Sequence, residues 1–126
     1  MSGETVLDEA VVASRLAREL PHWYLESGTI RRRVRTSGWK ATMMVVNVIG
    51  HLAEAAWHHP DLTVSYAFVI VKLSTHSAGG ITEKDFQLAR KMEDVINWQP
   101  GIEADSALEG TPQDDPRVRY IKFDEV

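Results

Sequence analysis

Residues 23–36, WYLESGTIRRRVRT, contain the hairpin signal from which the predicted fold is built. Two segments with strand-like composition, Trp23–Glu26 and Thr29–Thr36, are separated by Ser27-Gly28, a pair typical of tight turns. We therefore predict a β-hairpin at this point of the chain.

The second segment of the hairpin is predicted to be mainly apolar on one face and basic on the other, because side chains alternate along a strand. Ile30, Arg32 and Val34 share one face, whereas Arg31, Arg33 and Arg35 share the other. We call the second set the arginine row. Such a row is typical of a solvated sheet face and is also suited to docking an acidic partner, so both interpretations stay open.

Helices are predicted on both sides of the hairpin. From Leu7 to Leu20 the apolar residues recur with helical spacing, and Pro21 ends the helix. From about Gly38 to Ala56 a second helix has only a narrow polar sector. One sheet face cannot cover so apolar a helix, so we expect a second subunit against it and hence a homodimer or a homotetramer.

The next part of the chain is predicted to return to strand and then helix. Val64–Thr75 is rich in β-branched and aromatic residues and predicts a strand, bent or turned near its start. If the strand is unbroken, Tyr66 and His76 project to the same side. Thr82 should cap a third helix, and Asp85, at its third position, can accept the free backbone N–H groups there.

Length and composition indicate one compact domain followed by an arm. The chain has 126 residues, of which 44% are hydrophobic and 25% are charged, as in a domain with its own core. Beyond Trp98 the sequence becomes rich in Pro, Gly, Asp and Glu. We expect a domain over residues 1–98 and a C-terminal extension or arm over residues 99–126, ordered only where it docks.

Composition also argues against several classes of function. The chain has no cysteine, which excludes disulfides, thiolate metal sites and cysteine nucleophiles. A net charge of −4 argues against direct nucleic-acid binding. No stretch approaches the roughly 18 apolar residues of a membrane span, so we expect a cytoplasmic protein that binds no membrane.

Histidine is the best candidate for the chemistry. His58, His59 and His76 lie next to turns or strand ends, where functional side chains are commonly presented. A metal site that includes Glu54 or Asp61 is a weaker alternative, because consecutive histidines on an extended segment point apart and no two histidines stand four apart. No serine lies in a glycine-flanked elbow. Proton transfer by histidine fits better.

Spacing then adds a resemblance to a known family. The positions that match the signature of pterin-4a-carbinolamine dehydratases are Glu54, His58-His59-Pro60, Tyr66, His76 and Asp85. Ser74-Thr75-His76 and Gly80-Ile81-Thr82 are also similar to that family. The resemblance implies an α+β fold, in which a four-stranded antiparallel sheet has three helices packed on one face in the order α-β-β-α-β-β-α.

The resemblance implies an activity as well. Members of the family remove water from a 4a-hydroxytetrahydropterin to give a quinonoid dihydropterin, which recycles the pterin cofactor of aromatic amino-acid hydroxylases. The enzyme would be a hydro-lyase that needs no metal and no organic cofactor. Hydroxide is a poor leaving group, so the hydroxyl must gain a proton while a ring nitrogen loses one. Imidazoles, with a pKa near roughly 6.5, can do either.

The family signature also implies roles for single residues. His58 and His76 would be the proton-transfer pair, without an assignment of acid and base, and His59 would hold or orient the pterin. The other substrate-binding positions would be Trp23, at the edge of the pocket, Pro60 and Asp61. The supporting positions would be Glu54, Tyr66, Thr75 and Asp85.

A function of another class stays open. Some proteins similar to this family act as transcription-factor dimerisation cofactors or as RuBisCO assembly factors. The arginine row and the arm favour such a protein-binding role, whereas the complete histidine set favours catalysis. The chain also departs from many members at Thr36-Ser37-Gly38-Trp39, where they have an aromatic pair.

Overall fold

The computed structural model describes residues 5–112, 114–115 and 117–122. Its elements are α1 (Glu9–Glu19), β1 (Trp23–Glu26), β2 (Thr29–Arg35), α2 (Trp39–Ala56), β3 (Asp61–Val64), β4 (Phe68–Leu73), α3 (Glu83–Ile96) and the short 3-10 helix η2 (Pro100–Ile102). The predicted order of three helices and four strands is confirmed. None of the helices in these described ranges combines the length and the apolar character needed to cross a membrane.

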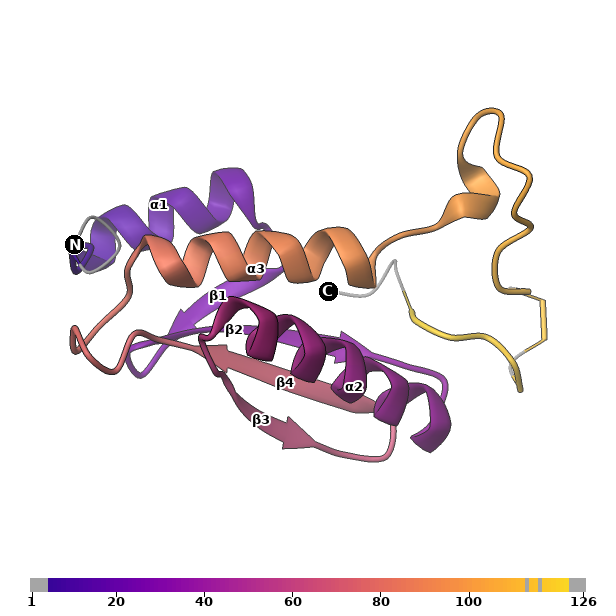
Figure 1. The fold of residues 1–126 in the computed structure, drawn as a ribbon, viewed down its shortest axis with the longest axis horizontal. Helices are drawn as coiled ribbons and strands as arrows, with labels where there is room; N and C mark the ends of the chain where they lie inside the picture. The colour runs from indigo at the N-terminus through magenta and orange to yellow at the C-terminus, as the bar shows by residue number, and fades with distance from the viewer. Residues whose placement is uncertain (1–4, 113, 116, 123–126) are drawn as a thin grey trace.

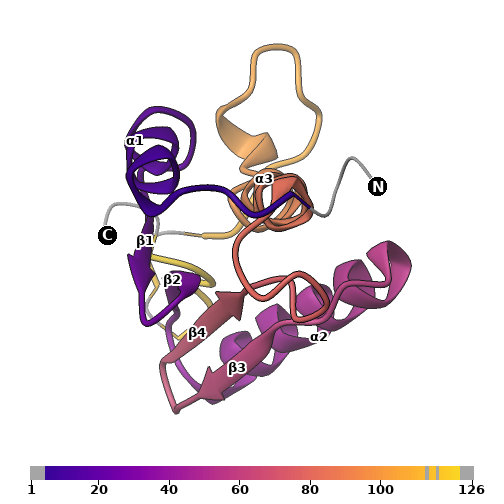
Figure 2. The same ribbon diagram turned by 90° about the vertical axis from the view of Figure 1, so that its left-hand side faces the viewer.

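The four strands form one antiparallel sheet in the order β1-β2-β4-β3. The three α-helices cover one face of this sheet (Figures 1 and 2). Ser27 and Gly28 both have a positive φ, 50° and 76°, which suits the tight turn between two twisted antiparallel strands. The predicted hairpin and the α+β fold class are therefore confirmed.

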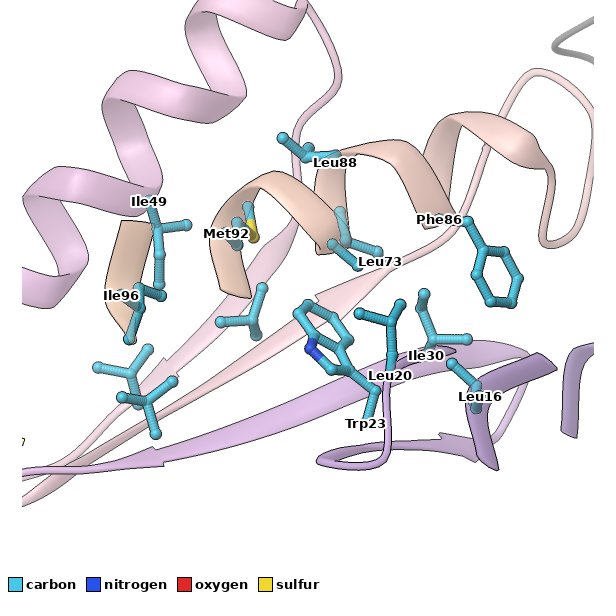
Figure 3. Close-up of a cluster of buried hydrophobic side chains, with 14 of the residues drawn as sticks. Leu16, Leu20, Trp23, Ile30, Ile49, Leu73, Phe86, Leu88, Met92 and Ile96 are labelled. Atoms are coloured by element: carbon cyan, nitrogen blue, oxygen red, sulfur yellow. The ribbon is translucent and has the colours of Figure 1, made fainter. Parts of the chain in front are cut away.

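The hydrophobic core lies between the sheet and the helices. Its fully buried residues include Val12, Ile30, Val34, Ile49, Val69, Val71, Leu73, Phe86 and Met92. Figure 3 shows side chains from α1, the sheet, α2 and α3 meeting in this core. The predicted apolar face of β2 is therefore the face that packs against the helices, together with Val69, Val71 and Leu73 of β4.

The apolar face of β2 also holds one charged side chain, Arg32. This guanidinium is buried, forms an ion pair with Glu93 of α3, and donates a hydrogen bond of 3.2 Å to Oδ1 of Asn97. A buried cation needs such partners. The arginine row lies on the opposite face, where Arg33 and Arg35 are exposed, so the predicted alternation is confirmed.

The segment 64–75, which was predicted as one strand, contains the last residue of β3, a turn and the whole of β4. Val64 ends β3, and the N–H of Ser65 donates to the carbonyl of Phe68 at 2.9 Å, which closes a turn before β4. The predicted bend is confirmed, but β3 begins earlier, at Asp61. Tyr66 and His76 now lie beyond opposite ends of β4, whose six residues span roughly 20 Å. The strand between Tyr66 and His76 is therefore not unbroken, which was the condition for the two side chains to project to the same side.

The end of the arm returns to the sheet. Ile121 is buried and forms an antiparallel bridge with Thr36. The N–H of Ser37 donates to the Tyr120 carbonyl at 3.1 Å, and the N–H of Lys122 donates to the Arg35 carbonyl at 3.0 Å. These bonds extend the sheet at the end of β2, beyond the residues that pair with β1. Residues 120–122 of the predicted arm therefore dock on the sheet, while residues 123–126 lie outside the described residues.

Candidate active site

The candidate site forms where α2 ends, β4 ends and α3 begins. Trp57 has a left-handed backbone conformation, with φ at 54°, and it ends α2. The N–H of His58 still donates to the Ala53 carbonyl at 3.1 Å. Pro60 has no N–H to continue a helical hydrogen-bond pattern, and β3 starts at the next residue. The sequence Trp-His-His-Pro thus presents two histidines directly after a helix end.

Asp85 caps α3 from inside the protein. It is fully buried, and its Oδ2 accepts the backbone N–H of Thr82 at 2.9 Å. The Thr82 hydroxyl in turn accepts the N–H of Lys84 at 3.2 Å, which completes a capping box. The capping roles predicted for Thr82 and Asp85 are confirmed. The cap also explains how a carboxylate is tolerated on the buried side of a helix.

The same carboxylate binds His58. Oδ1 of Asp85 lies 2.7 Å from Nε2 of His58, whose side chain is only 14% exposed. Oδ2 also accepts the hydroxyl of Thr75 at 2.8 Å, and this hydroxyl lies 2.7 Å from that of Thr82. A carboxylate only accepts hydrogen bonds. Nε2 of His58 must therefore carry the proton, which leaves Nδ1 of the neutral ring free to accept one.

His59 points away from this buried network. Its Nε2 lies 2.9 Å from Oε1 of Glu54, two residues before the end of α2. The ring also meets the Trp57 ring edge-on, with centroids 5.1 Å apart. Both partners of the pair are open to solvent, since the His59 side chain is 51% exposed. His59 can therefore contact a bound molecule while Glu54 orients its ring.

His76 lies at the exposed start of the loop between β4 and α3. It directly follows Thr75, whose backbone is fixed by the N–H of Gly79 donating to its carbonyl at 2.9 Å and by its bridge to Gly80. Asp61 is exposed at the first position of β3 and pairs across the sheet with Lys72. The structure therefore joins His58, Thr75 and Asp85 by direct hydrogen bonds and places His76 one residue from that network.

Two predicted site residues lie elsewhere in the chain. Trp23 is buried in the core, and its indole N–H donates to Oε1 of Glu93 at 2.8 Å. Glu93 is eight residues along α3 from Asp85, a helical rise of about 12 Å. Trp23 therefore does not stand at the edge of a pocket beside the histidines of the same chain. Tyr66 lies at the far end of β4, next to Gly38.

Two features of the structure were missed from the sequence. One is the buried network of Arg32, Glu93 and Asn97, which the position of Arg32 on the apolar face of its strand could have signalled. The other is the contact between Trp57 and His59, for which their closeness in the chain was the only signal. Among the residues that the structure describes, no three His, Asp or Glu side chains gather as they would around a metal ion.

Comparison with known proteins identifies the family. A family model described as pterin 4 alpha carbinolamine dehydratase matches residues 5–95. The chain belongs to this dehydratase family. The match contains every residue of the candidate site and ends before the arm, residues 99–126. The resemblance inferred from the histidine spacing is therefore confirmed.

Relatives and a solved structure agree with this assignment to the dehydratase family. A protein of Aquifex aeolicus is 48% identical over 82 residues, which are 65% of this chain and 83% of the relative. A protein of Nocardia farcinica is 35% identical over 95 residues, 75% of this chain and 98% of the relative. The names of both give pterin-4-alpha-carbinolamine dehydratase as a provisional function.

The solved structure comes from Brucella melitensis and is described as a transcriptional coactivator/pterin dehydratase. It superposes with a TM-score of 0.66 at 29% identity, and the match covers 72% of this chain and 98% of the other. Its description joins the two classes of function that the sequence left open for a member of the dehydratase family.

Proposed function

We propose that this protein dehydrates a 4a-hydroxytetrahydropterin to a quinonoid dihydropterin by histidine acid–base catalysis. The observation that carries the proposal is the hydrogen-bonded chain from Thr75 through Asp85 to His58. A buried carboxylate that fixes the orientation and tautomer of a histidine is an arrangement suited to proton transfer. Membership of the dehydratase family supplies the substrate class.

In this proposal His58 is the base and His76 is the acid. Nδ1 of His58 takes the proton of a pterin ring nitrogen, and Asp85 stabilises the imidazolium that forms. Protonated His76 gives its proton to the 4a-hydroxyl, and the carbon–oxygen bond breaks to release water. The electrons of the broken nitrogen–hydrogen bond form the new double bond, so no external oxidant or reductant is needed. The two histidines return to their starting states by exchanging protons with solvent.

The exposed neighbours of this pair would hold the substrate. His59, kept in position by Glu54, is placed to contact the pterin, and Pro60 and Asp61 follow it at the same sheet edge. Trp23 and Tyr66 have no part in the site that we propose, because the fold places them elsewhere. The proposed site therefore spans the end of α2, the start of β3 and the loop after β4.

The test is a stopped-flow assay of the dehydration of synthetic 4a-hydroxytetrahydropterin. We expect acceleration by the purified protein and loss of that acceleration in a His58→Ala, His76→Ala double variant. Acid–base catalysis contributes about 10²- to 10⁴-fold in rate, which sets the size of the expected loss. His22→Ala removes a histidine from the turn between α1 and β1, away from the candidate site, and serves as the control. Equal rates for the wild-type protein and the double variant would contradict the proposal.

A protein-binding role is the second candidate, favoured by one observation. The arm lies outside the family match, yet it docks on the sheet through Tyr120, Ile121 and Lys122. Binding of a partner could accompany catalysis or replace it. A well-folded protein that gives no acceleration in the assay would leave binding as the main function.

A further inference from the structure

The first part of the arm forms a second hollowed surface, at the opposite end of α3 from the histidines. Beyond α3 the chain rises away from the domain as a loop and then returns (Figure 1). A cavity of about 560 Å³ lies at the base of this loop. Its apolar lining comes from α2, α3 and the arm and consists of Val48, Val95, Ile96, Trp98, Pro100, Ile102 and Tyr120. We call it the apolar hollow.

A second hollow of about 420 Å³ adjoins the first and is acidic. Glu93, Asp94 and Glu103 line it, and Trp98, Gln99 and Ile102 line both hollows. No lysine or arginine is among the described residues that line either one. Glu93 is neutralised by Arg32, whereas Asp94 and Glu103 have no ion pair within the described part of the chain. We call it the acidic hollow.

The shape of the loop is specified by two glycines. A Cβ on Gly101 would overlap the carbonyl oxygen of Glu109, so only glycine allows this close approach. Gly110 has a φ of 82°, in the left-handed region that favours glycine. Farther along the arm, Tyr120 and Ile121 are tied to the sheet at the end of β2. The apolar hollow is therefore bounded by a loop that is closed at its base and anchored beyond it.

The wall between the two hollows exposes large apolar side chains. Trp98 is 58% exposed and Ile102 is 80% exposed. Apolar groups gathered in this way on a surface rimmed by polar residues mark interaction sites, and tryptophan is a common anchor of protein interfaces. The Tyr120 ring is half-buried beside them, and burial raises the pKa of its hydroxyl.

We propose that these two hollows bind a basic segment of a partner protein. An apolar side chain of the segment would enter the apolar hollow against Trp98, and a neighbouring lysine or arginine would lie beside Asp94 and Glu103. Charge complementarity favours this partner, since phosphate groups of nucleic acids or lipids would be repelled by the same carboxylates. Two adjoining hollows of different chemistry also suit alternating side chains of a peptide. The site is independent of the proposed dehydratase site, from which the 14 residues of α3, roughly 21 Å, separate it.

The test is an NMR titration of the full chain, labelled with 15N, with the peptide acetyl-Lys-Leu-Lys-Phe-Lys-amide. We expect saturable shifts of the Trp98 indole N–H and of backbone amides over residues 94–103. A peptide with glutamates in place of the lysines and one with serines in place of Leu and Phe should each bind at least about 10-fold more weakly. Such losses are typical of removing one anchor or reversing the charge of an interface.

Variants separate the contributions of the two hollows. Trp98→Ala with Ile102→Ser should lower the affinity for the first peptide at least about 10-fold. Asp94→Asn with Glu103→Gln should lower it and also reduce its dependence on salt. Leu108→Ser, an exposed change on the same loop but outside both hollows, is the matched control.

Several outcomes would overturn the proposal. They are the absence of shifts at millimolar peptide, equal binding of the basic and acidic peptides, and unchanged affinity in the Trp98 and Ile102 variant. Sedimentation of the protein alone is measured as well. If the Trp98 and Ile102 variant dissociates a wild-type oligomer, the hollows belong to an interface between copies of the chain. Dehydration rates should be the same for all of these variants, so failure of this proposal is distinct from failure of the dehydratase proposal.

Discussion

One carboxylate, that of Asp85, serves both the fold and the candidate site. Through Oδ2 it accepts the N–H of Thr82 and the hydroxyl of Thr75, and through Oδ1 it binds His58. A buried acid is tolerated where donors surround it. The helix cap therefore fixes the carboxylate, and the carboxylate fixes the histidine. A substitution that disturbs the cap should affect both stability and catalysis.

Thr75→Val is expected to show this coupling. Valine keeps the shape of threonine but removes one hydrogen bond from the buried carboxylate and one from the Thr82 hydroxyl, which should cost about 1–3 kcal/mol in the free energy of unfolding. We also expect roughly 10-fold slower dehydration, because the carboxylate loses a donor that orients it toward His58. Urea unfolding and the stopped-flow assay measure the two effects.

Two comparisons control this prediction. Thr75→Ser keeps the hydroxyl and should restore most of both losses, whereas Thr63→Val, on the exposed side of β3, should cause neither. A Thr75→Val protein as active and as stable as the wild type would show that the hydroxyl has no positioning role.

The sequence predicted part of the site at the scale of single residues. The family signature included both His58 and Asp85, without pairing them, and the structure joins them by a hydrogen bond; helix-cap rules predicted the place of Asp85. The spacing could not show that Trp23 would be buried, because its position depends on the packing of β1, at the far edge of the sheet, against α3. Nor could it show the turn that places Tyr66 beyond the opposite end of β4 from His76.

Local signals predicted most helices and strands, and the exceptions have physical reasons. Ser27-Gly28 specified one hairpin, and the alternation along β2 gave its buried face. β3 was harder to delimit, since it has only four residues and three of them are exposed, so no clear alternation marks it. It is defined by its antiparallel pairing with β4.

Helix α1 is tied to α3 by a cluster of charges whose effect should depend on pH. Arg15 donates to Glu19 at 3.0 Å, pairs with Glu83 and stacks on the ring of Phe86, while Arg90 donates to Glu19 at 3.2 Å. The hydrogen bond from Arg15 holds the pKa of Glu19 below its ordinary value of 4.5, against burial, which raises it. The cluster therefore favours the charged form of Glu19 in the folded protein.

Glu19→Gln should destabilise the protein at neutral pH and not in acid. A carboxyl group whose pKa is lowered by folding contributes stability above its unfolded pKa and loses it as the pH falls through the folded pKa. We expect a loss of less than about 1 kcal/mol at pH 7, since the pair is partly open to solvent. Urea unfolding should show that the loss shrinks as the pH is lowered below about 4.5. Glu103→Gln, which breaks no ion pair of the described residues, is the control, and a loss independent of pH would contradict the assignment.

At the scale of the whole molecule, α3 separates two surfaces. His58 binds Asp85 in its first turn, and the arm with its two hollows follows its last. The family match ends at residue 95, so the arm lies outside the matched residues. A domain boundary near residue 98 stays a prediction, as does the expected oligomer.

The exposed side of α2 should carry the contact between subunits. Met44 is 44% exposed although it lies in a largely apolar helix. We expect Met44→Lys to lower the mass measured by sedimentation, because a lysine would be buried without a partner at the interface. Gln87→Lys adds the same charge on the exposed side of α3, away from the proposed contact, and should leave the mass unchanged. A wild-type protein that sediments as a monomer would contradict the expectation.

The dependence of the dehydration rate on pH tests the central claim most directly. We predict a bell-shaped profile of kcat/KM, because His58 must be unprotonated and His76 must be protonated. The residual activity of His58→Ala should lose the fall at low pH, and that of His76→Ala should lose the fall at high pH. Exchanged effects would reverse the assignment of base and acid. Profiles in which both variants keep both limbs would contradict histidine acid–base catalysis at this site.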